Sequence, residues 1–133
     1  MEMDQNQQEI MYKLSIFEQQ IQQLQQQLQA VEQGIVEMSS LNLGLNDLKG
    51  AKDKEILTSI GKGIFAKTKL LSEELIVDIG ERKFVKKTIP KTQELIDTQI
   101  EKLEEIKKEL SKNLEKVNEE LIKTFKEVQE KEK

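Results

Sequence analysis

Few side chains in this sequence of 133 residues have the type and spacing that catalysis requires. The stretch Gly61-Lys62-Gly63 invites comparison with a phosphate-binding loop, because the backbone N–H groups of glycine-rich loops cradle phosphates. A Walker A motif at this place needs Gly at position 56 and Ser or Thr at position 63, whereas the chain has Ile56 and Gly63. The glycines therefore indicate a tight turn and no nucleotide site.

Neighbouring carboxylates are the other candidates for acid–base chemistry. They occur at Glu73-Glu74 and Glu104-Glu105, and Asp78 stands close to Gly80. None of them has a second catalytic residue type beside it. The chain also has no His and no Cys, which removes the commonest general bases, thiol nucleophiles and zinc, haem or iron–sulfur ligands. We therefore predict solvated charges, no enzymatic activity, no metal and no cofactor.

The net charge of −4 is distributed unevenly along the chain. Residues 1–48 carry −6, residues 49–91 carry +5 and residues 92–133 carry −3. Nucleic-acid binding needs a clustered basic face to neutralise phosphates, so these two acidic flanks predict no nucleic-acid partner. The basic middle is consistent either with contact to an acidic partner or with a solvated sheet face.

Apolar runs in the sequence are all much shorter than the roughly 20 residues that a transmembrane helix needs. The first residues, Met1 to Asp4, are acidic and lack the basic start of a signal peptide. We therefore expect a soluble, cytoplasmic protein without a membrane partner.

The elements that must position any functional side chain begin with an N-terminal coiled-coil helix within residues 1–48. Its apolar residues recur at alternating spacings of four and three, which is the seam of a coiled coil. Glutamine dominates between them, and the regular apolar positions favour a solvated helix face over an aggregation-prone tract. The seam positions are Ile10, Leu14, Phe17, Ile21, Leu24, Leu28, Val31, Ile35 and Met38.

A C-terminal coiled-coil helix within residues 90–133 has the same rhythm. Pro90 suits a first helical turn, and Thr88 is a plausible N-cap just before it. The seam positions are Ile96, Ile100, Leu103, Lys107, Leu110, Leu114, Val117, Leu121, Thr124 and Val128, of which Lys107 and Thr124 are polar.

The two seams align as an antiparallel helical hairpin. Pairing residues whose numbers add to 138 places Ile10 opposite Val128 and Leu24 opposite Leu114, and it keeps every layer in register as far as Met38. A slip of one heptad would keep the rhythm as well. We prefer the alignment at 138 because it leaves the two chain ends nearly flush.

Residues 49–89 change character and predict two β-hairpins. Short stretches rich in Ile, Val, Leu, Thr and Phe, at 55–60, 64–71, 75–79 and 83–89, are separated by turn residues. The fold class is thus mainly α with a small β region. Such hairpins bury too little apolar area to be stable alone, so we expect burial between subunits. The residues concerned are Ile56, Ile60, Phe65, Leu75, Val77, Ile79, Phe84 and Val85.

Several apolar residues lie near the free ends of the predicted helical hairpin. Met11, Ile122 and Phe125 flank the seam, and Met3 keeps the heptad phase without a partner in the preferred register. These residues either widen the seam or form an exposed, adaptable patch. With the last seam positions included, the candidate binding residues are Met3, Ile10, Met11, Ile122, Phe125 and Val128.

The order of coil, two hairpins and coil resembles the α-type subunit of archaeal prefoldin over nearly the whole chain. The segments 56–67 and 76–80 carry the resemblance. Gly63 and Phe65 match the glycine-rich stretch of the family, whereas Thr58-Ser59 replaces its Val-Pro pair. Two hairpins, where β-type subunits have one, indicate the α type.

The resemblance implies an ATP-independent holdase. In the family, two α-type and four β-type subunits join their hairpins into a double β-barrel. Coiled-coil arm tips grip non-native client proteins and pass them to a group II chaperonin, which assigns client binding to the six residues at the arm ends. A related form, gamma prefoldin, assembles with itself into filaments. A non-chaperone adaptor that binds one fixed partner helix is a further alternative.

Overall fold

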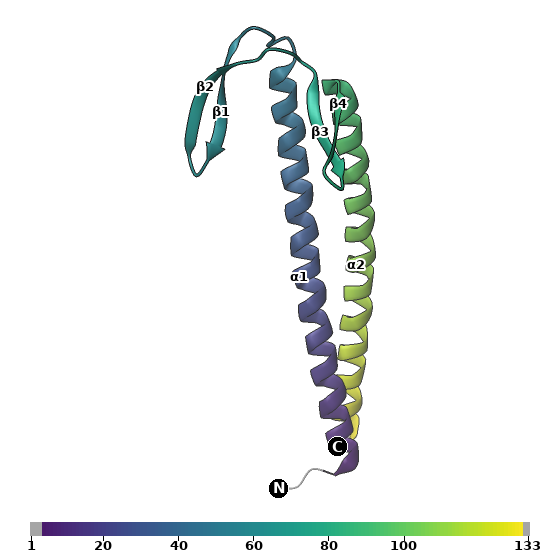
Figure 1. Ribbon diagram of the computed structural model, residues 1–133. Helices are drawn as coiled ribbons and strands as arrows, with labels where there is room; N and C mark the ends of the chain where they lie inside the picture. Colours follow the sequence, from purple (N-terminus) through teal and green to yellow (C-terminus); the bar gives the residue numbers. More distant parts are fainter. Residues whose placement is uncertain (1–3, 132–133) are drawn as a thin grey trace. The chain divides into compact units, whose positions relative to one another are not determined.

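The computed structural model describes residues 4–131 and is built from two long helices and two β-hairpins (Figure 1). This architecture confirms the predicted fold class, although a single chain does not show a closed barrel. In chain order the elements are α1 Gln5–Leu48, β1 Glu55–Gly61, β2 Ile64–Lys69, β3 Leu75–Gly80, β4 Lys83–Lys87 and α2 Ile89–Lys131.

Helix α1 begins with a reciprocal cap. The backbone N–H of Gln7 donates to Asp4 Oδ1 at 2.7 Å, and the backbone N–H of Asp4 donates to Gln7 Oε1 at 3.3 Å. This pairing satisfies two N–H groups that an uncapped helix would leave without partners. The cap explains why the helix begins at Gln5, inside the predicted segment of residues 1–48, whereas the candidate binding residue Met3 lies outside the described residues.

Helix α2 begins where the sequence predicts a cap. Thr88 Oγ1 accepts from the backbone N–H of Lys91 at 3.3 Å, and Pro90 stands in the first turn, where its missing N–H costs nothing. The predicted last strand was too long at this junction, because Ile89 opens the helix and is only 2% exposed. A single residue, Thr88, therefore connects β4 to α2.

The chain divides into two compact units. The first, which we call the arm, contains the described residues up to Ile35 together with those from Lys102 onward. Every predicted apolar seam position in the arm is half-buried, and the residues between them are nearly all exposed. The alternating spacing therefore identified the packed face of both helices, with Lys107 as the exposed exception.

Contacts between the helices of the arm agree with the predicted register. Lys107 Nζ lies 3.7 Å from a carboxylate oxygen of Glu32, and Leu103 Cδ1 would lie 3.4 Å from a Cβ atom built on Gly34. The residue numbers add to 139 in the first pair and to 137 in the second, on either side of the predicted sum of 138. A slip of one heptad would move these partners about 10 Å apart along the helix, so the contacts exclude it.

Gly34 is the weakest helical position of this layer, and replacing it with Ala should stabilise the arm. Ala gains about 1 kcal/mol of helix propensity, and the new methyl group would make an ordinary contact with Leu103. We expect a higher midpoint of thermal unfolding, followed by circular dichroism at fixed protein concentration. Gly44→Ala is the matched control, because nothing lies within 4 Å of that position. A lower midpoint for Gly34→Ala would contradict the packing described for this layer.

The second unit, Val36–Glu101, has its core where the two helices meet the strands. Leu45, Ile89 and Ile96 are buried there. Half-buried residues from both helices and from β3 pack against them, namely Met38, Leu48, Leu75 and Ile100. This small cluster is the main apolar core of the described chain, so much of the sheet surface has no intramolecular cover.

Polar side chains also join the helices of the second unit. Gln93 Nε2 donates to Asn46 Oδ1 at 2.7 Å, and Asn42 Nδ2 donates to Asp97 Oδ1 at 2.8 Å. Asn42 Oδ1 is buried without a partner, at a cost of about 1–3 kcal/mol. Hydrogen bonds of this kind have fixed partners, so they specify one helix register even though they add little stability.

Each β-hairpin turns through a two-residue loop whose residues both have positive φ. The loops are Lys62-Gly63, with φ of 51° and 80°, and Glu81-Arg82, with φ of 53° and 61°. Such mirror-image turns match the right-handed twist of antiparallel strands. The two hairpins do not pair with each other, so every strand keeps one edge without backbone hydrogen bonds.

Candidate interaction surfaces

Polar clusters in the described residues have structural roles. Asp78 Oδ1 accepts from the backbone N–H of Gly80 at 2.9 Å and so supports the β3–β4 turn. A carboxylate oxygen of Glu73 accepts from the backbone N–H of Gly50 and ties the linker between the hairpins to the end of α1. Within residues 4–131, no three His, Cys, Asp or Glu side chains lie close enough to hold a metal ion. No helix in that range is long and apolar enough to span a bilayer.

The β1–β2 hairpin has two unequal faces. On one face, Ile56 is paired with Thr68 and Thr58 with Ala66, and the hydroxyls of Thr58 and Thr68 share a hydrogen bond. On the other face Phe65 is 59% exposed. The predicted Ile60 is also exposed, next to the irregular pairing that precedes the turn. The hairpin therefore presents apolar side chains that its own chain does not cover.

The β3–β4 hairpin buries part of one face against its own helices. Val77 is paired with Val85, and both are half-buried, whereas the predicted Ile79 and Phe84 are exposed. Leu75, for which we predict burial between subunits, is half-buried and packs against the core of its own chain. That packing follows from the short Thr88 connection, which keeps this hairpin beside the start of α2.

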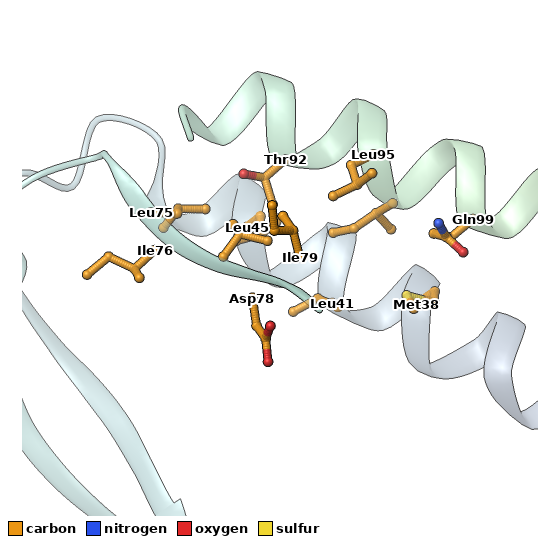
Figure 2. Close-up of a pocket in the computed structure, with 12 residues that line it drawn as sticks. Met38, Leu41, Leu45, Leu75, Ile76, Asp78, Ile79, Thr92, Leu95 and Gln99 are labelled. Carbon is orange, nitrogen blue, oxygen red and sulfur yellow. The ribbon is translucent and has the colours of Figure 1, made fainter. Parts of the chain in front are cut away.

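An open apolar groove of about 690 Å³ lies beside β3, within the second unit (Figure 2). Met38, Leu41 and Leu45 line it from α1, and Leu95 and Ile96 line it from α2. In Figure 2 the Asp78 carboxylate points away from Leu45 and Thr92, and the helices line the groove mostly with apolar side chains, together with Thr92 and Gln99. The groove and the uncovered strand edges together form an association-prone surface.

The arm carries the second set of exposed apolar residues. Met11, Ile122 and Phe125 are 56%, 55% and 55% exposed, so they lie outside the packed seam. Ile10 and Val128 are half-buried within the seam. Of the two alternatives for the flanking residues, these exposures favour an apolar patch over a wider seam.

Sequence reasoning missed two residues of the arm. Ile16 lines a groove with Phe17, Lys13 and Thr124, and Tyr12 is largely exposed on α1. An apolar residue directly before a seam position, as Ile16 is before Phe17, was the available signal. These residues add apolar area near the same end of the arm as Met11.

Comparison with known proteins identifies the family. The prefoldin subunit model matches residues 17–133. Curated relatives named prefoldin subunit alpha include one from Methanobrevibacter smithii, 33% identical over 73% of this chain and 67% of the relative. Another such relative, from Methanosphaera stadtmanae, is 26% identical over 74% of this chain and 71% of the relative.

A solved structure has the same fold. The cryo-EM structure of filamentous PFD from Methanocaldococcus jannaschii matches with a TM-score of 0.76, over 87% of this chain and 98% of that chain. Its identity of 16% supports the fold alone. The same family is indicated by the two hairpins between long helices, by the family model and by the curated relatives. This chain therefore belongs to the prefoldin family, as an α-type subunit.

Proposed function

We propose that this chain acts in an ATP-independent holdase that binds non-native proteins through the ends of its arms. The observation that supports this most is the exposure of Met11, Ile122 and Phe125 beside a packed seam. A soluble helical hairpin gains nothing in its own stability from such residues. Flexible and aromatic apolar side chains do suit partners without a fixed shape.

The site residues divide by accessibility in this proposal. Met11, Ile122 and Phe125 are available in the isolated chain, whereas Ile10 and Val128 become available when the helix ends separate. Met3 belongs to the proposed site but lies outside the described residues. Each side chain contributes up to roughly 1.5–3 kcal/mol when a client buries it fully. One arm therefore binds weakly, and several arms on one client bind strongly because their effective concentration is high.

The hairpins are the proposed assembly surface. The exposed side chains of Ile60, Phe65, Ile79 and Phe84, the half-buried Ile56 and the free strand edges would be buried by β-type prefoldin subunits in a barrel. Val77 and Val85 are half-buried and would complete that surface, to which Leu75 contributes least. A complex of this kind would work in the cytoplasm and deliver clients to a group II chaperonin.

A second assembly mode has its own support. The structural neighbour from Methanocaldococcus jannaschii is described as filamentous, and it matches 87% of this chain. The same exposed hairpins can pair with copies of this chain as well as with β-type subunits. A self-assembling holdase of the gamma prefoldin kind is therefore the alternative.

One experiment tests the proposed function. The purified chain, alone and mixed with a β-type subunit, is weighed by native mass spectrometry and then added to two unrelated unfolded proteins without nucleotide. We expect a defined oligomer or filament that suppresses light scattering by both proteins at stoichiometric amounts. Suppression of neither protein would favour a coiled-coil adaptor. If the chain is a folded monomer both alone and with the β-type subunit, the proposed assembly is contradicted.

A further inference from the structure

The arm has one neutral helix surface and one charged helix surface. Between Gln19 and Val31, α1 contains 13 residues, of which none is charged and eight are glutamines. All eight glutamines are exposed. The residues of α2 at the same level, 107–119, include seven Lys and Glu residues. The two helices of the arm therefore present very different chemistry to their surroundings.

Helix formation and solubility do not require this glutamine surface. Lys and Glu have helix propensities similar to that of Gln, and they add favourable pairs at i,i+4 on an exposed face. Helix α2 uses such charged residues at the same level of the same arm. The difference between the helices thus points to a property of the α1 surface itself.

Exposed primary amides match the backbone of an extended polypeptide. A glutamine side chain offers both an N–H donor and a C=O acceptor. An extended chain presents the N–H and C=O of every second residue on one edge, at intervals of about 6.6–6.8 Å. Along α1, Gln22 and Gln26 are about 6 Å apart in rise, which is close to that interval.

We propose that a glutamine stripe on α1 binds the extended backbone of non-native polypeptides along the arm. Helical spacing places its members on the face opposite the seam, and they are Gln19, Gln22, Gln26 and Gln29. The inference rests on the proposed holdase function and adds a second surface to the arm ends. The ends supply apolar contacts, whereas the stripe satisfies backbone groups that an unfolded segment leaves without partners.

The absence of charge explains how one surface serves many clients. Acidic chains approach a neutral stripe as readily as basic chains, and the backbone edge is the same for every sequence. The mixed charges of α2 attract some client segments and repel others, and its Lys and Glu side chains do not offer a donor and an acceptor on the same residue. The neutral helix therefore fits a partner defined by its backbone and not by its side chains.

Two variants of the full chain, in its assembled form, test this inference. One changes all four stripe residues to Ala, which removes the amides but keeps the helix. The other changes them to Glu, which adds four negative charges. The probes are reduced and carboxamidomethylated lysozyme, a basic unfolded chain, and lactalbumin treated in the same way, an acidic one. Binding is measured by fluorescence anisotropy, with helicity and native mass as checks on folding and assembly.

The Ala variant should bind both probes about three- to tenfold more weakly, since each lost hydrogen bond has a modest net value. The Glu variant should lose at least about tenfold more affinity for the acidic probe than for the basic one. The matched control combines Lys112→Glu with Lys116→Glu, which adds the same charge on α2 at the level of Gln26 and Gln22. It should change either affinity by less than about threefold.

Three results would overturn the inference. Unchanged binding by the Ala variant would show that the amides are not used. Equal effects of the Glu variant and the α2 control would show that only the net charge of the arm matters. A lower native mass of the Ala variant would show that the stripe joins copies of the chain. If the unmodified protein binds neither probe, the proposed holdase function fails together with the inference. If the unmodified protein binds both probes and the Ala variant binds them equally well, only the inference about the stripe fails.

Discussion

Replacing both Ile122 and Phe125 with Ser is expected to abolish suppression of aggregation while the assembly stays intact. Both side chains are more than half exposed and lie beside the seam, so their removal leaves the packed layers of the arm in place. Each substitution removes a contact with the client that is worth up to roughly 1.5–3 kcal/mol. The loss is repeated in every arm that holds the client, so the decrease in avidity greatly exceeds the decrease for one arm.

Light scattering of an aggregating unfolded protein, at a fixed ratio of subunits to client and without nucleotide, measures this effect. Deleting the first 12 residues should act in the same direction, since it removes Met3, Ile10 and Met11. Val36→Ser combined with Leu43→Ser is the matched control, because both residues are exposed on α1 outside the arm. Full activity of the Ile122 and Phe125 variant in an intact assembly would place client binding elsewhere in the complex.

Charged substitutions in the hairpins are expected to dissolve the assembly and leave the helices formed. Phe65→Glu removes an exposed aromatic ring from β2, so the isolated chain should lose little stability. At an interface the same change removes roughly 1.5–3 kcal/mol of apolar burial and adds the cost of burying a charge. This corresponds to a dissociation constant that rises by at least about tenfold at each interface.

Val77→Glu should have a similar effect, although Val77 is half-buried and lines the groove beside β3, so part of its cost falls within the chain. Sedimentation velocity and circular dichroism together separate loss of assembly from loss of helix. Lys67→Glu is the control, because it changes charge on the same strand without removing apolar area. An unchanged sedimentation coefficient for both Phe65→Glu and Val77→Glu would show that subunits join through another surface.

The helical part of the fold could be predicted because one physical rule governs it. Two helices that pack over their whole length must place an apolar residue at every fourth and third position. Of the two polar seam positions, Thr124 is half-buried, whereas Lys107 stays exposed and reaches Glu32 across the seam. The cap at the start of α1 was less obvious, although Asp4 and Gln7 have the spacing of a capping box.

The hairpins were harder to predict because alternation does not decide which face is covered. β3 has apolar residues on both faces, as Leu75 and Ile76 show, and β4 has Phe84 beside Val85. Only the position of β3 beside the helices assigns Leu75 to the core of its own chain. The sequence pattern predicts the strands, but it does not predict which face of the β3–β4 hairpin packs on the helices. That choice depends on the length of the connection at Thr88.

The antiparallel hairpin also sets an order for folding. The hydrogen bonds nearest the strands join residues 47 and 55 positions apart, whereas the Glu32–Lys107 contact closes a loop of 75 residues. Because contacts between distant residues form later, the helices should zip together from the core around Leu45 and Ile89 outward. The layer of Ile10 would then close last and open first, with the fastest amide hydrogen exchange of the seam. Fraying at that end would repeatedly uncover Ile10 and Val128, so local unfolding at the arm ends would enlarge the apolar surface without loss of the rest of the fold.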